Sequence, residues 1–431
     1  MSQRNYFDKF LNTFDIRTIL LGVMAMLMMA HPTAAQTAPK PITDLKPTVI
    51  LISLDGFRYD YLEKYPAPTL SLLAQQGVRA KWMTPSFPSH TFPNHYAIAT
   101  GLYPDHNGIV ANNIYAPEFN ETFSMSKKEE VQNGRWWLGE PIWVTAEKQG
   151  QRAGAFFFPG TEAEIAGKRP SIWKPFDDNF PNFERVDTVL SWLDLPKAER
   201  PTMITLYYSD VDHGGHDAGP DSEDVKQAIA RADQALSRLV DGLKARAIFD
   251  RVNLIIVSDH GMARVDPRNN IVLDNFIDMT QAHQIAWNGA MVHIFPKPGM
   301  EDAMYSSLKK APHVTVYRKK EIPERFHYGT SNRIGEIVVM AEEGWSINSR
   351  DRVRPAQLLP DGTVKYRGAH GFDNQLESMR ALFMGHGPAF KRAKVVEPFA
   401  NVDVYNVMAK ILKLKPAPND GDKATVKTVL R

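Results

Sequence analysis

Three short apolar runs, far apart along the chain, end at acidic or imidazole side chains. They cover residues 49–52 with Leu54, residues 203–206 and residues 254–257. The runs are rich in branched apolar residues and lack polar alternation, which is typical of strands buried on both faces of a parallel sheet. Ligand sites in open α/β sheets lie at the carboxyl ends of such strands, so we expect the residues after these runs to converge.

The spacing of apolar positions in the rest of the chain predicts two regions. From residue 47 to about residue 266, strands and helices alternate as in a doubly wound α/β domain. Its clearest helix runs from about residue 222 to 247, with apolar side chains at helical spacing and Asp221 or Ser222 as its cap. Residues 266–368 instead predict a smaller α+β subdomain, with strands at 290–295, 314–317 and 337–340 and a helix at 300–310. We therefore expect one catalytic domain, residues 47–431, with an insertion at 266–368.

The first 36 residues have a different pattern. Three basic residues precede a run of about 12 apolar residues at 19–30, and Thr33, Ala34 and Ala35 follow it. This order predicts an export signal cleaved near Ala35, because the run is short for a bilayer span; a retained anchor is the alternative. We therefore expect a periplasmic or secreted protein without a stable membrane span after signal removal.

Composition narrows the classes of function. The 431 residues are 43% hydrophobic and 23% charged, which suits a soluble enzyme with a large core. A net charge of +2, without any block of lysine or arginine, gives no electrostatic case for binding nucleic-acid duplexes or membrane surfaces as a main function. No cysteine is present. A metal would therefore be held by His, Asp and Glu alone.

The residues after the apolar runs have the chemistry of a two-metal hydrolytic centre. Two ions about 4 Å apart can bind the attacking and leaving sides of a phosphoryl transfer, each with about three protein ligands. Asp212 and His216, on a turn at Gly214–Gly215, would share one ion with His370. The second ion would be held by Asp55, Asp259 and His260. Singly, each of these residues is more often a turn former or a hydrogen-bonded core residue; the prediction rests on their arrangement at three strand ends and one glycine-flanked loop.

A candidate nucleophile lies in the segment from Ser86 to Tyr96. Pro93 is tolerated in the first turn of a helix, which places Thr91 at or just before a helix N-terminus, where backbone N–H groups attract anions. Metal coordination would lower the hydroxyl pKa and make Thr91 an attacking alkoxide. From the residues alone, Thr91 could equally be only the helix N-cap.

Several motifs resemble the nucleotide pyrophosphatase/phosphodiesterase family of the alkaline phosphatase superfamily. The similarity covers about residues 48–375 and is carried by TFPNHY at 91–96, GLYP at 101–104, GIV at 108–110, LDGFR at 54–58, GEPIW at 139–143, FFPG at 157–160, DHGGH at 212–216 and SDHG at 258–261. The resemblance implies a doubly wound, mostly parallel sheet of alkaline phosphatase type. It also implies two zinc ions on the two ligand sets above and Thr91 as the covalent nucleophile.

The same resemblance suggests how a nucleotide would be bound. Asn112, rather than Asn113, would point its amide N–H at a phosphate oxygen beside the Thr91 backbone N–H. Phe92 and Tyr207 stand where relatives sandwich the base, although only one of Tyr207 and Tyr208 can face the site. Asn94 is expected to be structural, and His95 is expected to form a hydrogen bond on the face of its helix. His90 replaces a lysine found in many relatives, which leaves the charge near the phosphate open.

We therefore expect a hydrolase that cleaves nucleotide phosphodiester or pyrophosphate bonds through a phospho-threonine and releases a nucleoside monophosphate. The alternatives are a phosphomonoesterase on the same centre and a lipid head-group phosphodiesterase. A different class is an inactive metal-binding protein. The expected partner is a small phosphodiester or nucleotide, and no protein partner is evident in the sequence.

Overall fold

The structure is a computed structural model that describes residues 39–431. Residues 41–431 form one compact unit, and the predicted signal at residues 1–36 lies outside the described residues. Between residues 39 and 431, no helix is both long enough and apolar enough to cross a bilayer.

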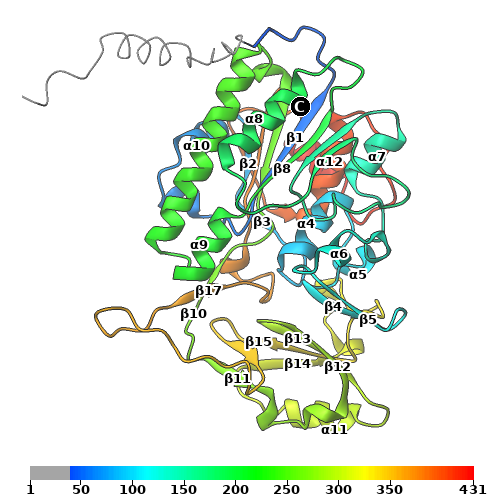
Figure 1. The fold of residues 1–431 in the computed structure, drawn as a ribbon, viewed down its shortest axis with the longest axis vertical. Coiled ribbons are helices and arrows are strands. Elements are labelled where there is room, and N and C mark those ends of the chain that lie inside the picture. The colour runs from blue at the N-terminus through cyan, green and yellow to red at the C-terminus, as the bar shows by residue number, and fades with distance from the viewer. Residues whose placement is uncertain (1–38) are drawn as a thin grey trace, which may run out of the picture. The chain divides into compact units, whose positions relative to one another are not determined.

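An eight-stranded sheet forms the core of this unit (Figure 1). In spatial order its strands are β19 (Lys394–Val396), β2 (Val78–Ala80), β18 (Phe383–His386), β9 (Val252–Val257), β1 (Thr48–Leu54), β8 (Met203–Tyr208), β6 (Ala153–Phe156) and β7 (Ile172–Lys174). Only β18 runs antiparallel to its neighbours. The three apolar runs of the sequence are therefore confirmed as the adjacent central strands β9, β1 and β8.

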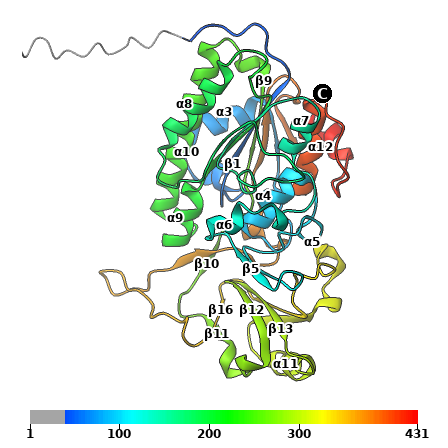
Figure 2. The same ribbon diagram turned by 45° about the vertical axis from the view of Figure 1, so that its right-hand side comes forward.

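Both faces of the sheet are buried, as the continuous apolar runs predict. Along β1, Val49 and Leu51 pack into one core, whereas Ile50 and Ile52 pack into the other. Figures 1 and 2 show helices on the two sides. One layer contains α3 (Pro68–Gln76), α8 (Asn182–Leu193) and α10 (Glu223–Ala245), and the other contains α4 (Thr91–Thr100), α7 (Ile142–Lys148) and α12 (Val404–Ile411). The sheet is thus doubly wound and mostly parallel.

The predicted long helix is α10. Ser222 is its N-cap, and its hydroxyl accepts a hydrogen bond from the Val225 N–H. Of the two cap residues that the sequence allowed, the structure uses Ser222 because its side chain reaches an N–H group that has no partner within the first turn.

A second, antiparallel sheet lies in the region predicted as an insertion. Its order is β12 (Ala282–Asn288), β13 (Met291–Pro296), β15 (Ile337–Ala341) and β14 (Val314–Arg318), with α11 (Glu301–Leu308) between β13 and β14. The chain leaves and returns through the antiparallel pair β10 (Ala263–Val265) and β17 (Arg367–Ala369). Strand β12 was not predicted, because its partly exposed residues lack a clear apolar run. The domain boundaries themselves stay a prediction.

The second sheet is fastened to the α/β core by polar contacts. The Asp105 carboxylate, in α5 (Pro104–Asn107), accepts hydrogen bonds from the N–H and hydroxyl of Thr330 and from the Ser331 N–H. The guanidinium of Arg333 donates to the carbonyl oxygens of Gly108 and Trp136. These contacts hold the segment between β14 and β15 against the α/β core.

Candidate metal centre

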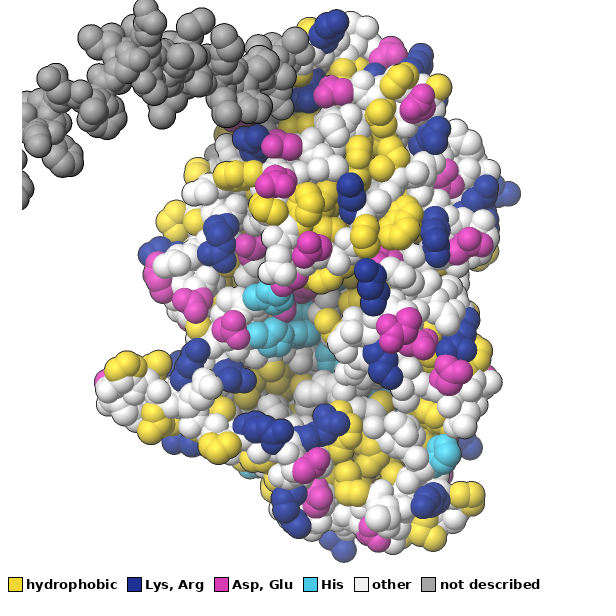
Figure 3. Space-filling view, viewed as in Figure 1, with side chains coloured by type: hydrophobic (Ala, Val, Ile, Leu, Met, Phe, Trp, Pro, Cys, Tyr) yellow, Lys and Arg dark blue, Asp and Glu magenta, His cyan; other side chains and the backbone are white. Residues whose placement is uncertain are grey.

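Six acidic and imidazole side chains meet in two groups at the carboxyl end of the sheet. Asp55 follows β1, and Asp259 and His260 follow β9; one possible ligand atom from each lies within 4.8 Å of the others. Asp212, His216 and His370 form the second group by the same measure. Figure 3 shows histidine side chains gathered in a hollow of the surface. The structure therefore brings together both ligand sets in the combinations that the sequence predicts.

The local structure around Asp212 and His216 differs from the expected turn. Both residues lie on helix α9 (Asp210–Ala218), which begins directly after β8. Residues four apart on a helix share a face, so the helix points both side chains at one position. The expectation of a turn was wrong because the two glycines at 214 and 215 suggest a break. A Cβ on Gly215 would lie 2.9 Å from the Met262 side chain, so the glycine allows α9 to pack closely against Met262.

The three histidines present the same ring nitrogen to the centre. Nδ1 of His216, His260 and His370 donates to the carbonyl oxygens of Gly368, Gly261 and Ser89, respectively. These bonds leave each Nε2 as the free acceptor, which is the usual arrangement of a metal-binding imidazole. The Nε2 atoms of His216 and His370 are only 3.1 Å apart.

The three carboxylates each leave one buried oxygen without a hydrogen-bond donor among the described residues: Asp55 Oδ1, Asp212 Oδ1 and Asp259 Oδ2. An unpaired buried carboxylate oxygen is costly unless a cation meets it. Asp212 Oδ1 lies 3.4 Å from His216 Nε2, and Asp259 Oδ2 lies 3.0 Å from His260 Nε2. The donor set of each group, with oxygen and imidazole nitrogen facing one another, therefore fits a divalent metal ion.

Burial and mutual repulsion perturb this centre. Burial, together with the charges of Asp259 and Asp212, raises the pKa of Asp55 well above its usual value. Burial also lowers the pKa of His370 strongly, and neighbouring His260 and His216 add to this effect. The Asp259 carboxylate differs: although burial opposes it, contact with His260 and His95 holds its pKa well below the usual value. Shifts of opposite sign within one cluster are typical of a functional site.

Thr91 is the first residue of α4, and its hydroxyl lies 3.3 Å from His260 Nε2. The N-cap position is occupied by His90, whose side chain makes no capping hydrogen bond. Thr91 is thus not the N-cap, and its side chain faces the Asp55, Asp259 and His260 group. The N-terminus of this ten-residue helix adds unpaired N–H groups that favour an anion.

Two histidines near Thr91 have structural contacts. His95 accepts from the Ser53 hydroxyl through Nε2 and donates through Nδ1 to the Thr91 carbonyl oxygen. Its Nδ1 also lies 3.3 Å from Asp259 Oδ2, a contact across the fold that the sequence does not indicate. His90 donates to the Asn288 carbonyl oxygen, and burial lowers its pKa to about 3. His90 therefore points at the second sheet and brings no charge to the site.

The three asparagines near Thr91 make different contacts, as the sequence predicts. Asn112 Oδ1 accepts from the Phe92 N–H, directly beside Thr91. Asn113 instead donates to the Trp287 carbonyl oxygen in β12. Asn94 bonds the backbone around the N-terminus of its helix, at Ser86, Pro88 and His90. Asn112 is thus the asparagine next to Thr91, while its role toward a phosphate stays a prediction.

A cavity of about 360 Å³ opens beside Thr91. Phe92 and Tyr207 both line it, as do Asp55 and Asp212. The Tyr207 ring is only 8% exposed, and its hydroxyl donates to Asp55 Oδ2 over 2.6 Å. Tyr208 faces away, under Arg185. The structure thus selects Tyr207 over Tyr208, and base stacking by Phe92 and Tyr207 stays a prediction.

The sequence missed other residues of this cavity. Phe176 is 48% exposed, lines the cavity and meets the Tyr207 ring edge-on with centroids 6.0 Å apart. Its backbone N–H is held by the Glu162 carboxylate. Phe176 lies in a stretch without periodicity, so only its exposure in the folded chain identifies it. Lys128 is the only lysine or arginine among the described residues that line this cavity.

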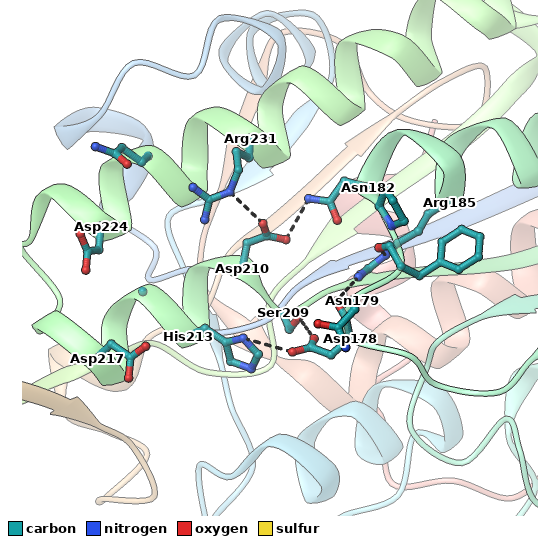
Figure 4. Close-up of a pocket in the computed structure, with 14 residues that line it drawn as sticks. Asp178, Asn179, Asn182, Arg185, Ser209, Asp210, His213, Asp217, Asp224 and Arg231 are labelled. Carbon is teal, nitrogen blue, oxygen red and sulfur yellow. Dashed lines mark hydrogen bonds and ion pairs between the residues drawn. The ribbon is translucent and has the colours of Figure 1, made fainter.

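Asp210 and His213, which lie beside Asp212 in the sequence, belong to neither metal group. They line an adjoining polar cavity of about 450 Å³ (Figure 4). There Asp210 accepts hydrogen bonds from Asn182 and Arg231, and His213 lies 3.5 Å from the Asp178 carboxylate. Asp210 is thus engaged in the polar cavity, whereas His213 also lines the cavity beside Thr91.

Comparison with known proteins agrees with this geometry. Residues 49–373 match the family described as type I phosphodiesterase / nucleotide pyrophosphatase. A venom phosphodiesterase of Crotalus durissus collilineatus is 38% identical over 394 residues, and ectonucleotide pyrophosphatase/phosphodiesterase family member 3 of Bos taurus is 37% identical over 397 residues. Each alignment covers 89% of this chain but only 46% and 44% of the relatives, so the chain spans less than half their length.

Solved structures give the same answer for the fold. Murine ectonucleotide pyrophosphatase/phosphodiesterase 5 superposes with a TM-score of 0.83 and 33% identity, over 89% of this chain and 100% of that one. An inactive variant of the murine protein, solved in complex with AMP, superposes with a TM-score of 0.82 and 32% identity, over the same shares of both chains. Fold and site together define a hydrolase with an α/β fold of alkaline phosphatase type and with candidate metal ligands at the carboxyl end of the sheet. The chain belongs to the type I phosphodiesterase / nucleotide pyrophosphatase family.

Proposed function

We propose that this protein hydrolyses nucleotide phosphodiester or pyrophosphate bonds and releases a nucleoside monophosphate. The proposal is carried by one observation: the Thr91 hydroxyl lies 3.3 Å from His260 Nε2, between buried carboxylates and an aromatic cavity. Family membership supports the reaction class, and the murine relative solved with AMP supports a nucleotide ligand.

Two divalent ions would lower the pKa of the attacking hydroxyl and stabilise the leaving oxygen. The mixture of imidazole and carboxylate donors suits zinc. Asp55, Asp259 and His260 would hold one, and Asp212, His216 and His370 the other. Each imidazole is oriented for this task by the carbonyl oxygen at its Nδ1.

The chain's own groups would act in two steps. The Thr91 oxygen loses its proton to solvent and attacks phosphorus; the Oγ–P bond forms as the bond to the leaving oxygen breaks, and that oxygen takes a proton from water. The Thr91 N–H and the Asn112 amide would meet the charge on the phosphate oxygens. Water then attacks phosphorus, and the Thr91 oxygen leaves and regains a proton. The purine or pyrimidine would lie in the cavity against Phe92, with Tyr207 and Phe176 opposite.

A diester is favoured over a monoester by the charges at the cavity. A monoester carries one more anionic oxygen, yet Lys128 is the only cationic Lys or Arg side chain among the described cavity residues, and His90 is directed at Asn288. We place the protein in the periplasm or outside the cell, which is supported by the basic, apolar and small-residue order within residues 4–35. Fractionation of expressing cells tests this location.

The function is tested with Thr91→Ala in metal-replete protein. We expect hydrolysis of bis-p-nitrophenyl phosphate to fall by at least about a thousandfold, because the nucleophile is lost, while metal content is retained. Thr100→Ala is the matched control, because it removes a threonine hydroxyl at the other end of α4 that bonds only the backbone. This variant should retain activity. Unchanged hydrolysis in Thr91→Ala would mean that another group is the nucleophile, and no hydrolysis by the metal-replete wild type would mean an inactive metal-binding protein.

The substrate class is tested by a panel on the wild-type protein. A preference for p-nitrophenyl phosphate over its diester would establish a phosphomonoesterase. Faster cleavage of choline phosphodiesters than of dinucleotides or nucleoside triphosphates would establish a lipid head-group enzyme. We expect the nucleotides to be preferred.

A further inference from the structure

Five basic residues gather on the surface at the amino end of the main sheet, opposite the metal centre. Lys391, Arg392, Lys394 and Arg431 together line one cavity of about 510 Å³. The Lys391 ammonium donates to the backbone carbonyl oxygens of Lys427 and Thr428, which brings Lys427 into the same group. We call these five residues the basic face.

The sequence does not indicate that these five basic residues lie together. Residues 388–431 contain nine lysines and arginines against four acidic residues, in a chain whose net charge is only +2. The nine are spread over 41 positions, so no block of like charge stands out. The fold collects five of them by pairing Phe390 with Leu430 and by bonding the Arg431 guanidinium to the Phe390 carbonyl oxygen.

The charges of these cations are not neutralised by carboxylates of the described residues, although Lys391 and Arg431 donate to backbone carbonyl oxygens. Among residues 39–431, no carboxylate forms an ion pair with any of the five, whereas nearby Lys81 is paired with Glu397. Acidic Asp250 lines a neighbouring cavity of about 460 Å³ together with Lys391 and Arg392, but it forms no ion pair with them. His386, 9% exposed, also lines that cavity, and its Nδ1 has no hydrogen-bond partner within the described residues.

Protection of a sheet edge does not account for this cluster. Lys394 and Val395 lie on β19, the edge strand of the main sheet, where lysine commonly prevents pairing with another sheet. However, Arg392, Lys427 and Arg431 lie outside that strand. Val395 is 53% exposed among these cations, and an apolar side chain within a basic surface is typical of proteins that bind a membrane interface.

The direction of the sheet places this face away from the site. His386 ends β18 and pairs with Leu254 near the start of β9, whereas Asp259 and His260 follow the end of β9. The chain also enters the fold at this end, where the Arg251 guanidinium donates to the carbonyl oxygens of Ile42 and Thr43 before β1 begins at Thr48. Figure 1 shows the C-terminus at the opposite end of the sheet from α9 and β17.

We propose that the basic face binds the phosphate-bearing surface of an anionic phospholipid bilayer and holds the metal centre outward, toward soluble substrates. Three features on the molecule favour a bilayer over a free phosphate or a nucleic acid. The cations are spread over an exposed surface, Val395 is exposed among them, and no carboxylate of the described residues pairs with them.

The test compares full-length variants in vesicle co-sedimentation. Arg392→Gln/Lys394→Gln/Lys427→Gln removes three exposed cations of the face. The matched control, Lys297→Gln/Lys309→Gln/Lys310→Gln, removes three exposed lysines from the second sheet region. All proteins carry the same leader, so any contribution of that segment cancels, and thermal melting followed by circular dichroism checks that each variant is folded.

We expect the wild type to partition onto vesicles containing about one third phosphatidylglycerol at least tenfold more strongly than onto phosphatidylcholine vesicles. The face variant should lose most of this preference, the control should keep it, and raising the salt from about 0.05 to 0.5 M should weaken it because the charges are screened. No preference in the wild type, or equal losses in both variants, would overturn the proposal. So would tighter binding of the face to a single-stranded oligonucleotide or to inorganic phosphate than to the vesicles.

Discussion

The hydrogen bond between Tyr207 and Asp55 gives a sharp prediction about how the centre is organised. Tyr207→Phe removes only the hydroxyl that donates to Asp55 Oδ2 over 2.6 Å. Tyr207 is 8% exposed and Asp55 is 1% exposed, so water has little access to replace the lost donor. Burial, followed by the charge of Asp55, raises the pKa of Tyr207 well above its usual value, so the wild-type hydroxyl stays a donor at working pH.

The expected magnitude follows from the partners. A buried hydrogen bond to a charged group contributes about 1.5–3 kcal/mol. Asp55 Oδ1 already lacks a hydrogen-bond donor among the described residues, so losing the bond at Oδ2 frees the carboxylate to rotate. We therefore expect metal affinity to fall by about 10- to 100-fold, as for other residues that orient a ligand. The aromatic ring remains, so KM for a nucleotide at saturating metal should change by less than about threefold.

The assay is competition with a chromophoric chelator, with KM measured separately in excess metal. Tyr208→Phe is the matched control, because its buried hydroxyl has no partner among the described residues and its loss leaves nothing unpaired. Unchanged metal affinity in Tyr207→Phe, or an equal loss in Tyr208→Phe, would refute the argument. A large rise in KM with unchanged metal affinity would instead assign the hydroxyl to substrate binding.

Two further predictions concern the second sheet. Asp105→Asn replaces a carboxylate oxygen that accepts hydrogen bonds from Thr330 and Ser331, and it should lower the free energy of unfolding in urea by about 2–4 kcal/mol. The control is the exposed Asp361→Asn, which loses similar bonds to Thr363 and should change this free energy by less than about 0.5 kcal/mol. Burial lowers the pKa of His293 from 6.5 to about 3, so below pH 6.5 the unfolded state binds a proton that the folded state excludes. The free energy of unfolding should therefore fall as the pH drops from about 6.5 toward 3. In urea unfolding, His293→Gln should reduce the loss of stability between pH 7 and 5 by up to about 2 kcal/mol. An unchanged dependence of stability on pH in this variant would contradict the prediction.

Much of the core and the ligand set could be predicted from local pattern. The strands β1, β8 and β9 are continuous apolar runs, and a residue at the carboxyl end of a buried parallel strand has few directions in which to point. Asp55, Asp259 and His260 therefore follow from their places in the chain. The helical conformation around Asp212 and His216 did not, because two adjacent glycines on their own suggest a turn, whereas in the fold they lie where α9 packs against α10 and Met262.

Contacts between distant segments were beyond any pattern in the chain. His95 was expected to bond along its own helix, which it does, but its approach to Asp259 depends on how α4 packs on the sheet. Phe176 and Glu162 stand in irregular stretches, and only the folded chain shows that one holds the other at the cavity. The basic face likewise consists of residues whose spacing in the sequence conceals their proximity.

By itself, the sequence determined which strands are buried, which side chains follow them and which family the motifs resemble, because periodicity and motif spacing act over a few neighbouring residues. Tertiary structure alone decided which ring nitrogens and carboxylate oxygens face one another, that Tyr207 reaches Asp55, and that cations near the C-terminus share one surface. The physical reason is distance along the chain: hydrogen bonds and charges act over a few ångströms in space, and only packing determines which remote residues come that close.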